Sequence, residues 1–535
     1  MLKSVLTASC ASLAVCAFAP SLASAQQSLS KGYQLLLNHG IQLQGMVTPD
    51  DVFHLSTYQD IGYTSVSWFS PTGITQLGPP PGYLWSRWVQ DPNQFPPTGD
   101  EGPYMPQCIG LAIMDEQNLS DSTVRDNLVN VFNGVTGNPA YANTLLYTNN
   151  YGGQAPDNAL ADFVARAKPD MLFFDTYPFK SSYDVNAPDH IGAAQPADVL
   201  PWESELRRYR AHSIADGIPF GAYMQTFHAV QDYDQTVYRD PSPSELRFNN
   251  NAAIAFNAKW LTGFTYNTGA SSLFTRPGGD SNPTPLYQDQ KLVNTRLKNW
   301  SNTLTRLTPI YDLHNPNDAN PPPGPASTDV NFPDGTTTSM MILRGKNSAG
   351  TTNGIPIGFQ SDPQAVPTLQ YSWWEFQKND PYFNGWGVTN VGTKNAGQIG
   401  DVIISWFRVL DEKMDGSSSG EIYMMITNAL TDPTGSAADC TQTINLKFLN
   451  LPDGDLSTLG NQGIAMLDPD TGSLMYPTLP SIGSGKVQLQ LTLAGGDAAL
   501  FKFNDGAPFV GVPEPTSAMA LLGMASLLLR RSRMR

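Results

Sequence analysis

Polar side chains that can carry out acid–base chemistry stand directly after several short apolar runs. They are carboxylates, amides and phenols, and they comprise Asp115, Glu116, Asn149, Asn150, Asp175, Tyr177, Gln225 and Tyr266. If the runs are parallel strands of one barrel, their carboxyl ends meet on one face and these side chains converge there. Such a set suits carboxylate-driven acid–base work on a hydroxyl-rich substrate.

This set lacks the hallmarks of other catalytic classes. It contains no serine nucleophile in a strand-to-helix elbow, no His-Glu-x-x-His metal motif and no phosphate-binding loop. We therefore expect neither a metal nor a cofactor. Trp68, Tyr177 and Tyr266 can offer ring faces and hydroxyls to a sugar, which makes them candidate substrate-binding residues.

The elements that must position these side chains alternate along the first half of the chain. Apolar runs occur at residues 41–47, 64–69, 109–114, 144–148, 171–174, 219–224 and 260–266. Amphipathic helical patterns lie between them, and Ser242-Pro243-Ser244-Glu245 is a capping box that predicts a helix start. This alternation favours a (β/α)8 TIM barrel over residues 26–320. Residues 84–89 are the best candidate for the eighth strand.

The second half of the chain has a different pattern. Between residues 335 and 506, short β-rich runs occur at 340–343, 402–407, 422–427, 443–448, 487–491 and 499–503. Many short strands with regular turns predict an antiparallel β-sandwich. The segment Asp468-Pro469-Asp470-Thr471-Gly472 has the residues of a turn. A calcium loop is the alternative, but further spaced oxygen ligands are missing.

Both ends of the chain are predicted to be sorting segments. Residues 1–25 combine Lys3, an apolar Ala-rich stretch and Ala23-Ser24-Ala25, which predicts a secretion signal peptide. A membrane anchor is the alternative, but the stretch is short and polar residues interrupt it. Residues 512–535 contain Val-Pro-Glu-Pro, four arginines and an apolar stretch shorter than the ~20 residues of a stable span.

The tail at 512–535 closely resembles the PEP-CTERM sorting signal, in which a Val-Pro-Glu-Pro motif, a short hydrophobic helix and a basic cluster follow in order. The resemblance implies transient membrane association and cleavage by an exosortase, after signal peptidase has removed the first segment. It further implies delivery to the cell surface or the extracellular space.

Charge and cysteine content restrict the partners. The chain has 31 basic and 47 acidic residues, and removal of both end segments takes away Lys3, four arginines and Glu514. The remaining 26 basic and 46 acidic residues give a net charge of −20, which disfavours nucleic-acid binding. Outside the signal peptide there are two cysteines, Cys108 and Cys440, which suffice for one disulfide or remain as buried thiols.

Several motifs resemble those of glycoside-hydrolase-like TIM barrels and occur in the same order. Residues 110–116, Gly-Leu-Ala-Ile-Met-Asp-Glu, are similar to the fourth-strand Asp-Glu element, and Phe-Asp-Thr-Tyr-Pro at 174–178 is similar to the sixth-strand element. Residues 219–225 are similar to the seventh strand, 244–266 to the last helix and strand, and 493–501 to the closing strand of the β-sandwich.

The resemblance implies that Glu116 is the proton donor. Gln225 stands where retaining relatives place a nucleophilic glutamate, and an amide cannot form the glycosyl-enzyme ester. Asp175 is then the best second carboxylate, as general base or nucleophile. A carboxyl separation of roughly 5–5.5 Å suits retention of configuration, and roughly 6.5–9.5 Å suits inversion.

The sequence thus predicts a secreted glycoside hydrolase acting on a polysaccharide or glycoconjugate. Glu116 and Asp175 are the predicted catalytic pair, and the predicted substrate-binding residues are Asp115, Tyr177, Gln225, Tyr266 and Trp68. The alternative is a non-catalytic carbohydrate-binding surface or matrix protein on a degenerate glycosidase barrel, which Gln225 and the sorting tail favour. A pair of close carboxylates in a deep cleft would favour the enzyme.

Overall fold

The fold is that of a computed structural model of the 535-residue chain. The structure describes residues 29–73, 82–187, 190–195, 199–231, 234–275, 278–309, 311–312, 337–338, 340–344, 370–371, 382–393, 402–410, 421–449, 451, 463–503 and 509–512. The predicted signal peptide lies outside these residues, and so does the predicted sorting tail apart from residue 512.

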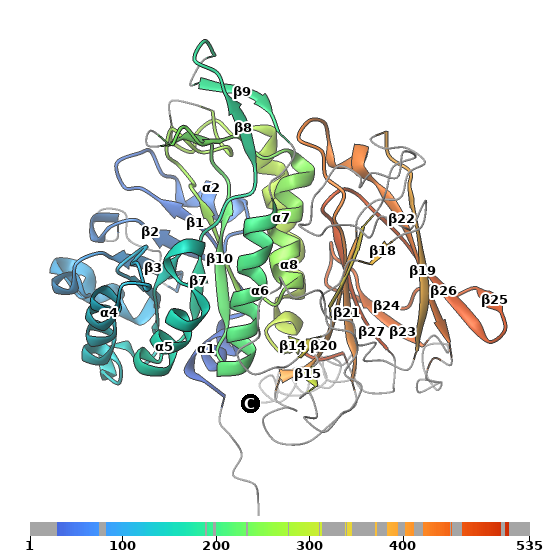
Figure 1. The fold of residues 1–535 in the computed structure, drawn as a ribbon, viewed down its shortest axis with the longest axis horizontal. Helices are drawn as coiled ribbons and strands as arrows, with labels where there is room; N and C mark the ends of the chain where they lie inside the picture. Colours follow the sequence, from blue (N-terminus) through green and yellow to red (C-terminus); the bar gives the residue numbers. More distant parts are fainter. Residues whose placement is uncertain are drawn as a thin grey trace, which may run out of the picture.

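Nine strands with parallel neighbours form a nearly closed barrel sheet (Figure 1). They are β1 (Gln42–Val47), β2 (Ser65–Trp68), β3 (Leu84–Val89), β4 (Cys108–Ile113), β5 (Leu145–Tyr147), β6 (Asn149–Asn150), β7 (Leu172–Phe174), β10 (Phe220–Gln225) and β13 (Trp260–Phe264). The order is β5-β4-β3-β2-β1-β13-β10-β7-β6, and Thr148 alone separates the two outermost strands in the sequence. Every predicted apolar run, including 84–89, corresponds to a strand of this sheet, because burial on both faces requires apolar side chains throughout.

Helices pack around the barrel sheet. They are α1 (Lys31–His39), α2 (Leu55–Asp60), α4 (Ser122–Val135), α5 (Asp157–Ala167), α6 (Val199–Asp216), α7 (Pro243–Ala255) and α8 (Pro285–Leu304). α7 begins at the predicted capping box, in which Ser242 and Glu245 each accept the backbone N–H of the other. Between β3 and β4 the chain forms the 3-10 helices η1 (Pro92–Gln94) and η2 (Gly99–Gln107) instead of an α-helix.

A small antiparallel sheet, here called the cap sheet, follows the carboxyl ends of two barrel strands. Its order is β11 (Ala229–Val230), β12 (Val237–Tyr238), β8 (Lys180–Tyr183) and β9 (Ile191–Ala194). β8 and β9 lie between β7 and α6 in the sequence, whereas β11 and β12 lie between β10 and α7. In Figure 1, β8 and β9 project beyond the barrel at the top of the view.

The second half of the described chain forms antiparallel sheets. Their strands are β14 (Leu307–Pro309), β15 (Tyr311–Asp312), β16 (Thr337–Thr338), β17 (Met340–Arg344), β18 (Gln370–Tyr371), β19 (Phe383–Asn390), β20 (Val402–Val409), β21 (Tyr423–Asn428), β22 (Gln442–Leu449), β23 (Ile464–Leu467), β24 (Leu474–Met475), β25 (Ser481–Gly483), β26 (Lys486–Leu493) and β27 (Ala498–Phe503). One sheet has the order β18-β17-β20-β21-β27-β23-β24 with β14 paired to β20, and another has the order β19-β22-β26-β25. Trp406, Phe448 and Phe501 lie in one apolar cluster, so these two sheets share a core.

The six predicted runs of this half correspond to β17, β20, β21, β22, β26 and β27. β14 already pairs with β20, so the chain joins the antiparallel sheet soon after α8 and before residue 320. The predicted turn is also present. The Asp468 carboxylate accepts the N–H groups of Asp470 at 2.9 Å and Thr471 at 2.8 Å, and Gly472 has a φ of +69°.

The antiparallel sheet that contains β20 and β21 packs on α7, and α8 lies beside α7 (Figure 1). Arg247 of α7 contacts Asp497 at 3.2 Å, and Arg296 of α8 pairs with Asp470 at 2.8 Å. Gly496, with a φ of +78°, lies so close to α7 that an added Cβ would fall 2.3 Å from the backbone nitrogen of Phe248. The two halves of the chain therefore meet through close backbone packing as well as ion pairs.

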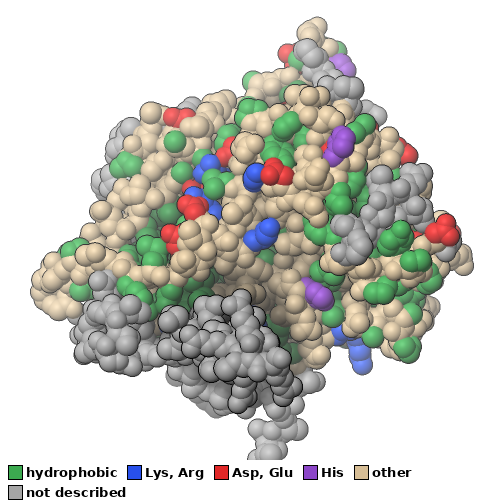
Figure 2. All heavy atoms as spheres, turned by 180° about the vertical axis from the view of Figure 1, so that it is seen from behind, with side chains coloured by type: hydrophobic (Ala, Val, Ile, Leu, Met, Phe, Trp, Pro, Cys, Tyr) green, Lys and Arg blue, Asp and Glu red, His purple; other side chains and the backbone are tan. Residues whose placement is uncertain are grey.

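The surface charge and the state of the cysteines can be compared with what the composition predicts. On the face shown in Figure 2, Lys and Arg side chains are few and lie singly or beside Asp and Glu. Cys108 and Cys440 are both buried and are not joined in a disulfide. Among the described residues, no helix is long and apolar enough to cross a membrane.

Candidate active site

A cavity of about 230 Å³ opens at the carboxyl ends of the barrel strands, beneath the cap sheet. Three carboxyl groups, six aromatic rings and two further residues line it: Trp88, Asp115, Glu116, Asp175, Tyr177, Tyr223, Phe227, Ala229, Gln231, Tyr238 and Phe264. The structure thus brings together Asp115, Glu116, Asp175 and Tyr177, as the sequence predicted. In the described part of the chain, no group of three or more side chains has the arrangement of a metal site.

The backbone that presents the Asp-Glu pair is strained. Met114 and Glu116 have φ values of +50° and +52°, a left-handed conformation that non-glycine residues rarely adopt. Two hydrogen bonds hold it, from the N–H of Met114 to the carbonyl of Val89 and from the N–H of Glu116 to that of Asn149, both 2.8 Å. Strain of this kind gathers at functional sites, where the surrounding structure maintains it.

The Glu116→Gly protein is therefore expected to have a free energy of unfolding about 1 kcal/mol higher than that of the Glu116→Ala protein, because glycine adopts positive φ without steric cost. Urea denaturation of the Glu116→Gly and Glu116→Ala proteins measures the effect, since both lack the carboxylate and alanine retains the strained backbone. Equal stability of the two variants would show that the conformation at residue 116 costs nothing.

Asp115 is held beside the cavity by a neighbouring amide. The Nδ2 group of Asn149 donates to Asp115 Oδ1 at 2.9 Å. Burial raises the pKa of Asp115 to about 7, and the Glu116 charge adds to this, while the hydrogen bond from Asn149 opposes it. The protonated and ionised forms of Asp115 are therefore both populated near neutral pH.

Asp175 follows β7, and its N–H donates to the carbonyl of Asn150 at 3.2 Å. Its side chain lines the same cavity as Glu116, and its Oδ1 is buried with no hydrogen-bond partner within the described residues. Burial raises the pKa of Asp175 well above the usual value of a carboxyl, and the charges of Glu116 and Asp115 raise it further. Asp175 consequently ionises less readily than an ordinary carboxyl.

Aromatic side chains form the wall around these carboxyls. The Trp88 indole donates to the Tyr223 hydroxyl at 2.6 Å, which fixes both rings. Tyr177 stacks on Phe264 with a centroid distance of 6.1 Å and an interplanar angle of 28°. Phe227 packs edge-on against both of them, at 4.8 and 5.4 Å. Rings in mutual contact give a rigid apolar surface suited to the faces of a sugar ring.

Gln225 is not in the cavity, which corrects the prediction that its amide contacts the substrate. Both amide hydrogens are used, in bonds to the carbonyls of Phe179 at 2.8 Å and Arg239 at 2.9 Å. Its Oε1 accepts the N–H of Phe179 at 2.9 Å. Gln225 therefore ties the chain before β8 to the chain after β12, and it supports the cap sheet rather than the ligand.

Trp68 and Tyr266 are also absent from the cavity lining. Trp68 packs edge-on against Phe53 at 5.5 Å, and Tyr266 lies between Tyr58 and Phe274 at 4.8 and 5.0 Å. Both are buried in the cluster that includes the helices, whereas Trp88 and Tyr223 belong to the cluster inside the barrel. Side chains alternate between the two faces of a strand, so a strand-end position does not by itself decide the face.

The residues that complete the aromatic wall were not predicted from the sequence. Trp88, Tyr223 and Phe264 lie within barrel strands, and the alternation of side chains along those strands is the signal that could have identified them. Phe227, Ala229, Gln231 and Tyr238 come from the cap sheet and its approaches, for which the sequence carries no comparable pattern.

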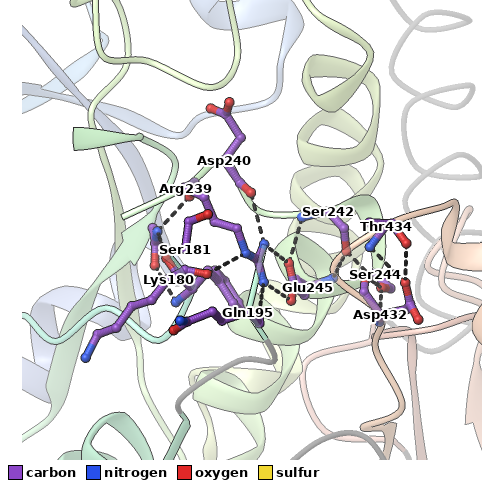
Figure 3. Close-up of polar contacts among 12 residues, drawn as sticks. Lys180, Ser181, Gln195, Arg239, Asp240, Ser242, Ser244, Glu245, Asp432 and Thr434 are labelled. Atoms are coloured by element: carbon purple, nitrogen blue, oxygen red, sulfur yellow. Dashed lines mark hydrogen bonds and ion pairs between the residues drawn. The ribbon is translucent and has the colours of Figure 1, made fainter. Parts of the chain in front are cut away.

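A buried ion pair anchors the cap sheet to α7 (Figure 3). Arg239, next to β12, donates to both carboxylate oxygens of Glu245 at 2.6 and 2.7 Å. The same guanidinium donates to the carbonyls of Lys180 at 2.9 Å and Gln195 at 3.0 Å. Arg239 is 5% exposed and Glu245 is fully buried. One side chain thus joins both cap segments to the start of α7.

Comparison with known proteins gives similarity to solved structures alone. No family model matches the chain, and no curated protein matches it. Similar solved structures include a β-galactosidase from Marinomonas ef1, with 10% identity over 50% of this chain and 62% of that chain, at a TM-score of 0.33. This chain therefore covers less than two thirds of that β-galactosidase.

Two further glycoside hydrolases match over more of the chain. An endo-β-1,4-mannanase from Cellulomonas fimi has 11% identity over 75% of this chain and 95% of that chain, with a TM-score of 0.32. A maltogenic α-amylase from Thermotoga neapolitana has 9% identity over 88% and 99%, with a TM-score of 0.33. At this level of similarity an activity has to be argued from the site itself.

Proposed function

We propose that this protein is an exported glycoside hydrolase that acts on a polysaccharide or glycoconjugate. In this proposal the nearly closed sheet is a (β/α)8 barrel, the antiparallel sheets are a β-sandwich, and the terminal segments direct export and surface delivery. The observation that carries the activity is that Asp175 and Glu116 line the same aromatic cavity, where the Glu116 charge raises the pKa of Asp175. Two carboxyls of unlike environment are the machinery of glycosidic bond hydrolysis.

The environments of the two carboxyls suggest how they divide the work. Glycoside hydrolysis needs one carboxylic acid that protonates the leaving oxygen and one carboxylate that attacks the anomeric carbon or activates water. Asp175 is the group whose raised pKa keeps a proton available. We therefore assign proton donation to Asp175 and the second role to Glu116, which reverses the assignment that the family resemblance implied.

Reducing-sugar release from a broad polysaccharide panel tests the activity. The purified protein is expected to act on at least one glycan, and Glu116→Gln is expected to lower kcat by about 100-fold or more, because an amide neither attacks nor accepts a proton. Asp50→Asn is the control, since Asp50 is an exposed carboxylate on a loop that follows a barrel strand.

A non-catalytic carbohydrate-binding role is the other outcome of this test. Binding of a glycan without release of reducing ends, unchanged in the Glu116→Gln protein, would establish that role and reject the hydrolase. Equal loss of activity in the Glu116→Gln and Asp50→Asn proteins would show that the effect does not arise in the cavity.

A further inference from the structure

The carboxyls that line the cavity are half-buried or exposed, and they have other partners than the carboxyls that are buried in the described structure. Each of the buried carboxyls contacts a basic side chain: Glu101 with Arg87, Glu203 with Arg207, Glu205 with Arg208, Glu245 with Arg239, Asp280 with His54, Glu421 with Lys502 and Asp497 with Arg247. Asp115, Glu116 and Asp175 form no ion pair with any described residue. The buried acids of the described structure are therefore neutralised by a neighbouring base, whereas the more accessible carboxyls of the cavity have no basic partner among the described residues.

The lining supplies no positive charge of its own. None of its eleven residues is Lys, Arg or His, and six of them are aromatic. A carboxylate among apolar rings is costly to ionise unless a counter-charge is present. Like charges repel strongly in such surroundings, so a sugar acid, a sulfate or a phosphate is disfavoured. A cation, in contrast, would meet both the carboxylates and the faces of the rings.

Cleavage of a glycosidic bond requires two carboxyl groups, and the cavity contains three. Glu116 and Asp175 suffice for hydrolysis, and Asp115 remains available for recognition. Asn149 holds Asp115 through a single oxygen at 2.9 Å, and the unpartnered Oδ1 of Asp175 lies nearby as a further acceptor. The cavity thus presents acceptors and aromatic faces to a ligand that brings donors and positive charge.

We propose that the cavity binds an amino sugar, with the ammonium group against Asp115 and the aromatic wall. The natural glycan would then contain 2-amino-2-deoxyhexose units that carry a free amine. This inference rests on the hydrolase function proposed above, because it assigns the substrate class of the same cavity.

Calorimetric titration with methyl glycosides that differ in one substituent tests the proposal. The probes are the methyl β-glycosides of glucosamine, N-acetylglucosamine and glucose, together with their galacto epimers, which place an ammonium, an acetamido or a hydroxyl group at carbon 2. In at least one series, the full-length protein is expected to bind the amine about tenfold or more tightly than the other two sugars. In the Asp115→Asn protein this preference is expected to fall to about twofold, and added salt is expected to weaken it in the parent protein.

The outcomes separate this inference from the proposed function. Tighter binding of the hydroxyl or acetamido sugar, or a preference for the amine that survives Asp115→Asn, would overturn the inference. Hydrolysis of glucose or N-acetylglucosamine polymers without preference for the amine would leave the hydrolase standing and reject the amino sugar. Tight binding of the amine with no hydrolysis of chitosan or of any other glycan would support the amino-sugar site and reject the hydrolase.

Discussion

The Asp115→Asn protein is expected to be more stable than the parent protein at pH 8 by about 2–4 kcal/mol, and equally stable at pH 4. Burial raises the pKa of Asp115 from 3.8 to about 7, which corresponds to about 4 kcal/mol for a fully buried group, and partial exposure to the cavity reduces the effect. Because the folded pKa lies above the unfolded one, the parent protein loses stability as pH rises from about 4 to 7. Asparagine does not ionise and still accepts the hydrogen bond from Asn149.

Urea denaturation of both proteins at pH 4 and pH 8 measures this difference. Asp50→Asn serves as the control, because its exposed carboxylate is expected to change stability by less than about 0.5 kcal/mol at either pH. A stability difference between the Asp115→Asn and parent proteins that stays constant from pH 4 to pH 8 would contradict the expectation. Such a result would mean that Asp115 ionises in the folded protein as easily as in the unfolded chain.

Breaking the buried ion pair between Arg239 and Glu245 is expected to lower the free energy of unfolding by about 3–5 kcal/mol. Arg239→Met leaves the Glu245 carboxylate buried without its counter-charge, which is more costly than the loss of the attraction alone. The double variant Arg239→Met/Glu245→Leu removes both charges and is expected to regain a large part of the lost stability. Since Arg239 also binds both cap segments, the single variant is expected to weaken substrate binding.

The free energies of unfolding of the two variants and the Michaelis constant on an active glycan provide the measurement. Arg166→Met is a matched control, because Arg166 pairs with Asp126 at 2.7 Å on the surface, where solvent screens an ion pair and leaves it little effect on stability. A loss below about 1 kcal/mol in Arg239→Met would show that Glu245 is solvated or protonated without Arg239.

The barrel strands could be predicted from sequence because each of them is buried on both faces. A run such as 109–114 has to be apolar throughout, and strand β4 lies there. The cap sheet could not be predicted, since its strands contain two to four residues and β9 is half-buried or exposed. Such short strands carry no periodicity, and their pairing depends on contacts between distant segments.

Within the site, residue type was a better guide than strand position. The three carboxylates that follow barrel strands, Asp115, Glu116 and Asp175, meet in one cavity. Gln225 has the same strand-end position, yet backbone groups use both hydrogens of its amide. A polar side chain without charge can satisfy the backbone as easily as a ligand, and the sequence does not distinguish the two.

The start of α7 links the two halves of the protein in a way that constrains their evolution. The N–H of Asp432, in the antiparallel half, donates to Ser244 Oγ at 3.1 Å, and Ser244 lies within the capping box whose Glu245 holds Arg239 (Figure 3). The Asp432 loop of the antiparallel half therefore contacts the start of α7, the same helix end that holds the cap sheet over the cavity in the barrel half. Gene recombination that exchanged either half alone would separate parts that fit together here. Viable chimaeras should inherit α7 and the Asp432 loop from the same parent.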